Sequence, residues 1–189
     1  MSLVDVLAAV EQAAGVGSHA VIGAVARNAW APPRATTDLD FTIAARPDTL
    51  VAIESALGTL GYRPVRRQQT EPGDTLPDIV ILRSEDAEPR QVDLLMAKTP
   101  FEGEVIARAE RIDVGPVATP VATPEDLVVY KLLADRPRDR EDIRAILRTQ
   151  SRTARSFDWA HVERWVSFWQ ISDRLARLRA DPSVQAEPR

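Results

Sequence analysis

Residues 34–43 read RATTDLDFTI, and the last six of them alternate strictly between polar and apolar side chains. Because successive side chains of a β-strand point to opposite faces, this alternation predicts a strand whose buried face includes Leu39 and Phe41. Asp38 and Asp40 then leave the other face together, about 6–7 Å apart along the strand. Two neighbouring carboxylates raise each other's pKa unless a cation lies between them, so this D-x-D pair suits a Mg²⁺ site.

A third carboxylate strengthens this interpretation. Asp93 interrupts an otherwise apolar predicted strand, residues 90–96 (RQVDLLM), and a carboxylate there needs a partner or a cation. If the two strands are neighbours, Asp38, Asp40 and Asp93 form one acidic cleft that holds Mg²⁺ or Mn²⁺, which is typical of metal-assisted phosphoryl or nucleotidyl transfer. The alternative is a pair of acids on an exposed sheet face.

The rest of the chain shows two patterns. Up to about residue 115, strands and helices alternate: we expect helices over 3–14 and 47–60, strands over 19–25, 36–43, 78–83, 90–96 and 110–114, and a polar loop over 66–76. Thr123-Pro124-Glu125-Asp126 is a helix start, with a cap, a proline and acids in the first turn. Four helices are expected after it, over 124–135, 138–149, 158–169 and 171–180.

These patterns predict an α/β (α+β) fold with a mixed β-sheet core and a C-terminal helical annex. The core is expected over 1–115, the annex packed on it over 116–182, and a flexible tail over 183–189.

Composition excludes several classes of protein. The chain has no cysteine, which excludes disulfides, thiolate zinc sites and a cysteine nucleophile. The net charge of −4 does not indicate a protein held to nucleic acid by its overall charge, although a local basic patch is compatible with it. No apolar run approaches the length of a membrane span, and the N-terminus has no basic signal region. We therefore expect a cytoplasmic protein with no membrane partner.

Two stretches resemble a known family. Residues 20–43 (AVIGAVARNAWAPPRATTDLDFTI) are similar to the opening motif of the nucleotidyltransferase superfamily, a glycine turn followed by R-x-T-x-D-x-D. Residues 123–147 (TPEDLVVYKLLADRPRDREDIRAIL) resemble the corresponding segment of AbiEii-like nucleotidyltransferases, many of them toxins of toxin–antitoxin pairs. The resemblance implies the nucleotidyltransferase fold, a nucleoside triphosphate substrate and two Mg²⁺ (or Mn²⁺) ions.

The resemblance also implies roles for particular residues. Asp38, Asp40 and Asp93 hold the metal ions, and Asp93 ligates the second metal or takes the proton of the acceptor hydroxyl. Lys131 contacts phosphates. The nucleotide-binding residues are then Gly23, Ala24, Arg34 and Asp142, with the backbone N–H groups after Gly23 around the triphosphate.

Some positions depart from the pattern or allow two interpretations. Ala24 stands where the family has a second glycine or a serine, and the alternative pair Gly17-Ser18 lies before the strand. Lys131 either points to phosphates or snorkels to the surface. Asp142 either orients Lys131 or an arginine, or forms ion pairs on a helix surface.

Residues 136–155 contain seven arginines and three acids. Such a stripe is either a solvated helix face or a surface for triphosphate or RNA phosphates. Trp165 and Trp169 indicate a core or dimer contact rather than a base-stacking platform. His19 and His161 have no ligand partner at a useful spacing, so we expect them to be structural.

Two hypotheses follow. The first is a metal-dependent nucleotidyltransferase that moves a nucleoside monophosphate to tRNA, a partner protein or a small molecule, as the toxin of a toxin–antitoxin pair or in another role. The second is a degenerate protein of the same fold that binds a partner as an antitoxin or binding protein without turnover. Intact Asp38, Asp40 and Asp93 favour the first, and Ala24 favours the second.

Overall fold

The computed structural model describes residues 1–44, 46–71 and 77–181. Their contacts divide the chain into two compact units: a sheet unit (1–26 and 34–122) and a helical unit (27–33 and 123–189). In chain order the elements are α1 (Leu3–Ala14), β1 (His19–Ile22), α2 (Gly23–Trp30), β2 (Asp38–Ile43), α3 (Pro47–Thr59), β3 (Arg63–Gln68), β4 (Asp78–Arg83), β5 (Gln91–Met96), α4 (Pro100–Arg108), β6 (Glu110–Val114), β7 (Val117–Val121), α5 (Pro124–Ala134), α6 (Pro137–Gln150), α7 (Trp159–Phe168) and α8 (Ser172–Ala180).

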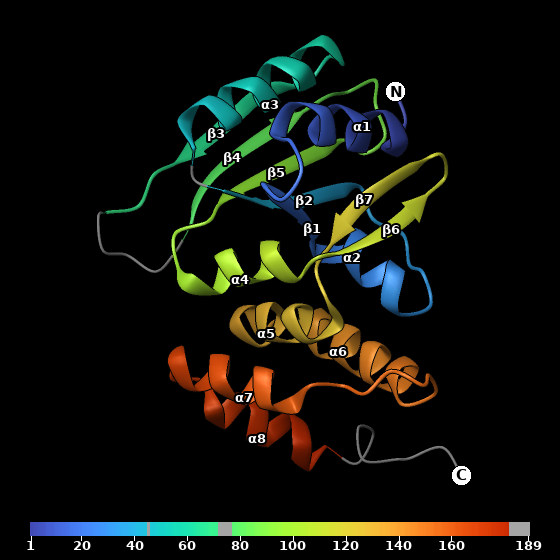
Figure 1. The fold of residues 1–189 in the computed structure, drawn as a ribbon, viewed down its shortest axis with the longest axis vertical. Helices are drawn as coiled ribbons and strands as arrows, with labels where there is room; N and C mark the ends of the chain where they lie inside the picture. Colours follow the sequence, from blue (N-terminus) through green and yellow to red (C-terminus); the bar gives the residue numbers. More distant parts are fainter. Residues whose placement is uncertain (45, 72–76, 182–189) are drawn as a thin grey trace. The chain divides into compact units, whose positions relative to one another are not determined.

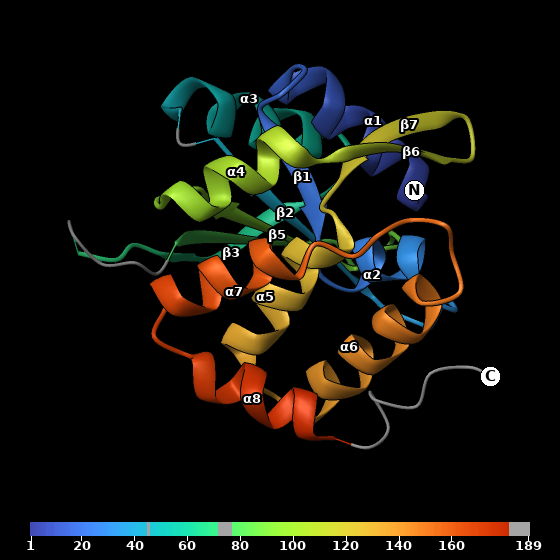
Figure 2. The same cartoon turned by 60° about the horizontal axis from the view of Figure 1, so that its bottom comes forward.

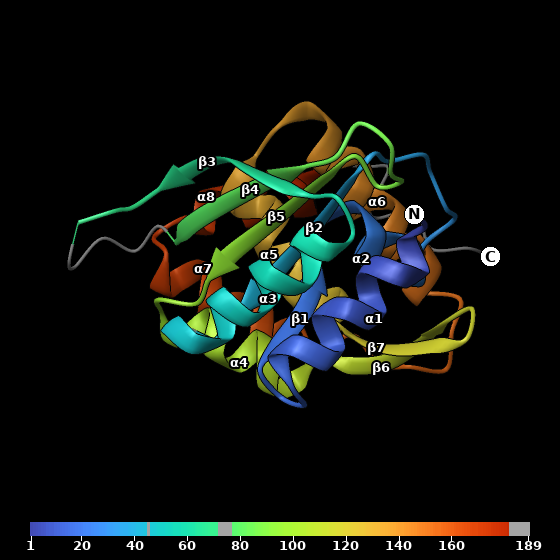
Figure 3. The ribbon, with the colours of Figure 1, turned by 90° about the horizontal axis from the view of Figure 1, so that it is seen from above.

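The sheet unit is built on a seven-stranded mixed sheet in the order β3-β4-β5-β2-β1-β7-β6. The pairs β2–β5 and β1–β7 are parallel, and the others are antiparallel. Figure 1 shows α1 and α3 on one side of the sheet and α4 on the other. Figure 3 looks down on the first side, where α1 and α3 lie against each other. β2 and β5 thus lie near the middle of the sheet.

The sheet unit buries the residues that the apolar patterns predict. Leu39 and Phe41 on β2 are fully buried, as are Val6 and Val10 on α1. Because their spacings are two on the strand and four on the helix, each element presents one apolar face to the core. This burial leaves the opposite face of β2 to carry Asp38 and Asp40.

The helical unit contains α5 to α8 and the last part of α2, which begins in the sheet unit. α5 packs against α6 and α7, and α7 packs against α8 (Figure 2). Thr123 caps α5, since its side chain accepts a hydrogen bond from the backbone N–H of Asp126. The predicted helix start at Thr123 is therefore confirmed.

The predicted fold class is confirmed, and four elements went unpredicted. The strand expected over 19–25 ends at Ile22, because the chain turns at Gly23 and begins α2. The prediction is therefore wrong for residues 23–25. α4 and β7 were not predicted, and β3 overlaps the expected loop 66–76. Residues 72–76 of that loop and the expected tail 183–189 lie outside the described residues. The predicted boundaries 1–115 and 116–182 stay a prediction.

Among the described residues, none of the helices has the length and apolar character that crossing a bilayer requires.

Candidate active site

The central feature of the site is the pairing of two acidic positions on β2 and β5. These strands are parallel neighbours, and Asp40 is the register partner of Asp93, while Asp38 is the partner of Gln91. Side chains in register on adjacent strands leave the same face of a sheet, and so do residues two apart on one strand. Asp38, Asp40 and Asp93 therefore share one face.

Gly23 fits closely against Asp40. Ile22, the last residue of β1, pairs with Asp40, and Gly23 follows with a φ of +68°. A Cβ atom at Gly23 would lie 1.9 Å from Oδ2 of Asp40, which no side chain can occupy without a shift. The carboxylate of Asp40 thus lies over the first residue of α2. The free N–H groups at a helix N-terminus favour anions, so this is also a place for phosphate oxygens.

Asp93 is held by a chain of hydrogen bonds along the sheet. Nε2 of Gln91 donates to Oδ1 of Asp93 at 2.9 Å, and Nε of Arg83 donates to Oε1 of Gln91 at 2.9 Å. Burial raises the pKa of Asp93 above its ordinary value, the bond from Gln91 lowers it, and the nearby charge of Asp38 raises it again. Asp93 is therefore an acid whose ionised form is disfavoured in the absence of a cation.

Asp38 lies at the open end of the same face. It is exposed, and its Oδ1 accepts a hydrogen bond from the hydroxyl of Thr37 at 3.0 Å. Together with Arg83, Arg90 and Gln91 it lines a surface hollow of about 810 Å³. The lining of this hollow carries charges of both signs, since Glu85 also belongs to it.

Whether these residues fit a metal ion depends on the ion. Within residues 1–44, 46–71 and 77–181, no three carboxylate or histidine side chains come close enough together to hold an ion by themselves. Mg²⁺, however, is usually bound by one or two carboxylates, and water and substrate phosphates complete its shell. Asp40 and Asp93, as register partners, supply two such carboxylates. They fit an ion that arrives with a nucleotide, and not a site filled by protein ligands alone.

Two further predicted residues of the sheet unit lie near the start of these elements. Ala24 is the second residue of α2 and is half-buried. Arg34 is half-buried in the segment between α2 and β2, where its Nη1 donates to the carbonyl oxygen of Ala35 at 3.4 Å. Their roles in nucleotide binding stay predictions.

Lys131 and Asp142 belong to the helical unit, where they form a buried ion pair. Lys131 is only 6% exposed and Asp142 only 2%. Nζ of Lys131 donates to Oδ2 of Asp142 at 2.6 Å and to Oδ1 of Asp139 at 3.3 Å. Nε of Arg27 lies 3.1 Å from Oδ1 of Asp142. Lys131 therefore does not snorkel to the surface, and Asp142 is not part of a surface ion pair.

Sequence reasoning missed three participants. Asp139 is one of the three acids of residues 136–155 and was given no role, although its spacing of three residues from Asp142 puts both on one helix face. Gln91 and Arg83 were not singled out, and their contact with Asp93 depends on the pairing of β4 with β5. The signal for Gln91 was its position two residues before Asp93 on one strand.

The fold and the acidic face indicate one class of protein, and the family whose model matches the sequence belongs to the same class. The family described as "Nucleotidyl transferase of unknown function (DUF2204)" matches residues 3–175. The chain belongs to this family and is a nucleotidyltransferase. The AbiEii-like subgroup is not the family that matches, so that assignment stays a prediction.

Solved structures share the fold at low sequence identity. ANT(2″)-Ia, solved in complex with adenylyl-2″-tobramycin, is 14% identical, with a TM-score of 0.53 over 94% of this chain and 95% of that one. JHP933 from Helicobacter pylori is 16% identical, with a TM-score of 0.50 over 97% of this chain and 82% of that one. MenT4, a nucleotidyltransferase toxin from Mycobacterium tuberculosis, is 21% identical, with a TM-score of 0.49 over 86% of this chain; this chain covers 60% of its length. No curated protein matches the chain.

Proposed function

We propose that this chain transfers a nucleoside monophosphate from a nucleoside triphosphate to an acceptor hydroxyl. In this reaction the acceptor oxygen forms a bond to the α-phosphorus, the bond from that phosphorus to the β-phosphate oxygen breaks, and pyrophosphate leaves. The observation that carries the proposal is the register of Asp40 with Asp93, beside a glycine that leaves space for the Asp40 carboxylate.

In this proposal the acidic face binds the divalent ion. Asp40 and Asp93, with Asp38 beside them, hold Mg²⁺ or Mn²⁺ together with the triphosphate. When bound, the ion supplies positive charge to the phosphate oxygens and orients them. In the alternative role, Asp93 accepts the proton of the acceptor hydroxyl.

The triphosphate itself is bound by the start of α2. Backbone N–H groups at Gly23 and Ala24 donate to phosphate oxygens, and the helix dipole favours their negative charge. Arg34 supplies a further positive charge in the segment that leads to β2. A serine hydroxyl is absent at position 24, so the backbone donors take its place.

Lys131 is the proposed phosphate-binding cation of the helical unit. Its ammonium is a compact charge with three donors, and two of its contacts are with Asp142 and Asp139. These two carboxylates fix its position, so Asp142 acts as a positioning residue for Lys131.

To test this proposal, each nucleoside triphosphate is labelled at the α-phosphate and incubated with the protein and one of three acceptor pools: total tRNA, a cell lysate or a set of aminoglycosides. The measurement is the label that enters each pool. The pools cover a toxin that modifies tRNA or protein, and an enzyme that modifies an antibiotic. Asp40→Asn serves as the inactive variant, and Asp113→Asn on the exposed β6 edge is its matched control.

We expect label to enter one pool with wild type and Asp113→Asn, and not with Asp40→Asn. Label from the γ-phosphate must not appear, because it leaves with pyrophosphate. No incorporation in any pool, combined with normal nucleotide binding, would instead support the second candidate, a binding or antitoxin protein without turnover. That candidate is favoured by one observation, Ala24 in place of the family's glycine or serine.

A further inference from the structure

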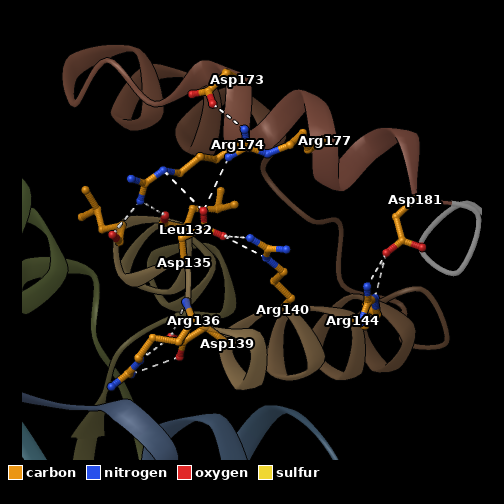
Figure 4. A network of polar contacts seen from close by, with 11 residues as sticks. Leu132, Asp135, Arg136, Asp139, Arg140, Arg144, Asp173, Arg174, Arg177 and Asp181 are labelled. Carbon is orange, nitrogen blue, oxygen red and sulfur yellow. Dashed lines mark hydrogen bonds and ion pairs between the residues drawn. The ribbon is translucent and has the colours of Figure 1, made fainter.

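The helical unit contains a cavity of about 110 Å³ lined by residues of α5, α6 and α8 and by Asp135 and Asp181. Figure 4 shows the polar contacts of its charged residues. Its floor is apolar, formed by Leu132, Ile143 and Leu178. Its charged lining residues are Lys131, Asp135, Arg140, Arg144, Arg174, Arg177 and Asp181. The acidic face of the sheet unit contributes nothing to this cavity.

Asp135 is the point at which three of these arginines meet. Its carboxylate accepts from Nε of Arg140 at 2.9 Å, and nitrogen atoms of Arg177 and Arg174 lie 3.5 and 3.8 Å from it. The hydrogen bond from Arg140 lowers the pKa of Asp135 below its ordinary value, and the positive charges of the other two lower it further. One carboxylate therefore contacts three guanidinium groups, of which that of Arg177 also pairs with Asp173 at 2.9 Å.

Arg174 is fixed without a close carboxylate of its own. Its Nη1 donates to the carbonyl oxygens of Leu132 and Leu133 at 2.8 Å each, at the end of α5. Such contacts hold the guanidinium plane in place, and among the described residues its one carboxylate neighbour is Asp135, 3.8 Å from Nε. The group is thus preorganised with donors left over, which is the arrangement that favours oxyanion binding.

Arg144 is occupied by the second carboxylate. Nε and Nη2 of Arg144 both donate to Oδ2 of Asp181, the first of them at 2.9 Å. A guanidinium fork matches carboxylate and phosphate in the same geometry, so Asp181 takes the place that an external oxyanion would take.

The charges around the cavity do not balance. Four guanidinium groups face Asp135 and Asp181, and Asp173 pairs with Arg177 at 2.9 Å, which leaves one positive charge in excess among these residues. Lys131 also lines the cavity, and its partners are Asp139 and Asp142. The helical unit as a whole carries 14 lysines and arginines against 11 acids, a net charge of +3, although the full chain is at −4. The volume is that of a few water molecules, at about 30 Å³ each in the liquid, so it admits one tetrahedral oxyanion and excludes a nucleoside.

We propose that this cavity binds a single phosphate group, and that Asp181 competes with it for Arg144. The group is either the phosphodiester of an RNA strand or a small free phosphate. Lys131 lines the cavity as well, but the proposal does not depend on nucleotidyl transfer, because Arg140, Arg174 and Asp181, which the test changes, have no role in that reaction.

The test is a calorimetric titration of the full chain with inorganic phosphate, at fixed ionic strength and with a chelator present. The chelator removes the divalent ions without which the acidic face repels phosphate. Arg174→Gln and Arg140→Gln each remove one guanidinium, Asp181→Asn removes the competing carboxylate, and Arg152→Gln removes an exposed arginine outside the cavity. Circular dichroism checks that each variant is folded.

We expect opposite effects from the two kinds of variant. Arg174→Gln should weaken phosphate binding by roughly 10-fold or more, the typical effect of one charge-assisted hydrogen bond, and Asp181→Asn should tighten it several-fold. Arg152→Gln should bind as wild type does. The side chain of Arg140 is exposed, so Arg140→Gln should fold even if Arg174→Gln does not, and it then serves as the test variant. No saturable binding, or the same affinity in all four variants, would overturn the proposal.

A second titration with a short single-stranded RNA identifies the source of the phosphate group. If the source is RNA, Arg174→Gln weakens and Asp181→Asn tightens RNA binding in the same order as for phosphate. If the source is a small phosphate, only the phosphate titration changes. Both results support the site, whereas variants that change thermal stability but neither titration would show an ion-pair network that merely joins α5, α6 and α8.

Discussion

Asp40 and Asp93 are register partners on the parallel strands β2 and β5, and the carboxylate of Asp40 lies where a side chain at position 23 would have to be. This relationship brings two hard oxygen donors to the start of a helix, near the centre of the sheet. A divalent ion needs the oxygen donors, and a phosphate group bound to that ion needs the helix N-terminus. Four predictions follow from it and from the buried pair in the helical unit.

The first concerns the metal-binding carboxylates. Asp40→Asn and Asp93→Asn should each lower nucleotidyl transfer by about 10³-fold, since each removes one charged ligand from the site of phosphoryl charge. Asp113→Asn, an exposed acid on β6, should transfer at the wild-type rate. The measurement is label incorporation at matched folded concentration, and equal rates for Asp93→Asn and Asp113→Asn would contradict the role given to Asp93.

The second concerns stability and pH. Burial raises the pKa of Asp93 above its ordinary value of 3.8, so the folded state holds this proton more tightly than the unfolded state. The resulting stabilisation is present at low pH and is lost as pH rises from that value through the raised pKa. At neutral pH, Asp93→Asn should therefore melt above wild type, by roughly 2–4 °C if the buried charge costs about 1 kcal/mol.

Melting curves between about pH 4 and pH 8 check this prediction, since linkage ties the slope to the difference in bound protons. The gap between Asp93→Asn and wild type should narrow as pH falls toward 4. A gap that widens on acidification would mean that the pKa of Asp93 is lowered, and not raised.

The third concerns the glycine beside Asp40. Gly23→Ala should lower the free energy of unfolding by about 1–3 kcal/mol, because it adds backbone strain at positive φ and a clash with a carboxylate. It should also abolish transfer by displacing Asp40. Gly103→Ala is the matched control: its Cβ meets nothing within 4 Å and it lies within α4, so it should be neutral or slightly stabilising. Denaturant unfolding and label transfer measure both effects.

The fourth concerns Lys131. Lys131→Met should lower transfer by about 10²–10³-fold, and it should also destabilise the fold by about 3–5 kcal/mol, because it leaves Asp139 and Asp142 buried with less positive charge. The double variant Lys131→Met with Asp142→Asn removes one of these charges as well. It should recover much of the stability and none of the transfer.

Recovery of both properties in the double variant would show that Lys131 serves only the packing of the helical unit. Lys131→Arg adds a second comparison. A planar guanidinium does not reproduce a compact ammonium, so transfer should be restored only in part.

Much of the acidic face was predictable because it depends on local periodicity. Strict alternation placed Asp38 and Asp40 on one face, and a single acid in an apolar strand marked Asp93. The register of Asp40 with Asp93 was not predictable, because strand pairing is decided by the packing of the whole sheet. The same holds for the Gln91 and Arg83 contacts, which depend on two different strand pairs.

The missed elements have physical reasons of their own. β3 is an exposed edge strand with arginines at 63, 66 and 67, so it has no apolar alternation to detect. α2 is only eight residues long, and Gly23 was taken as a turn within a strand. The burial of Lys131 depends on the packing of α5 against α6, which brings Asp139 and Asp142 to it. Helical spacing alone predicts that these two acids share a face, but not that they contact Lys131.

The binding of a nucleotide with its metal ion tests the central claim most directly, since it needs no knowledge of the acceptor. Mn²⁺ is titrated into the protein with a nucleoside triphosphate analogue whose α,β-bridge is a methylene group, and bound Mn²⁺ is followed by electron paramagnetic resonance. Wild type and Asp113→Asn should bind Mn²⁺ only with the analogue present, and Asp40→Asn and Asp93→Asn should bind it at least about 10-fold more weakly. Equal binding by Asp93→Asn and wild type, or analogue binding that does not depend on Mn²⁺, would contradict the account.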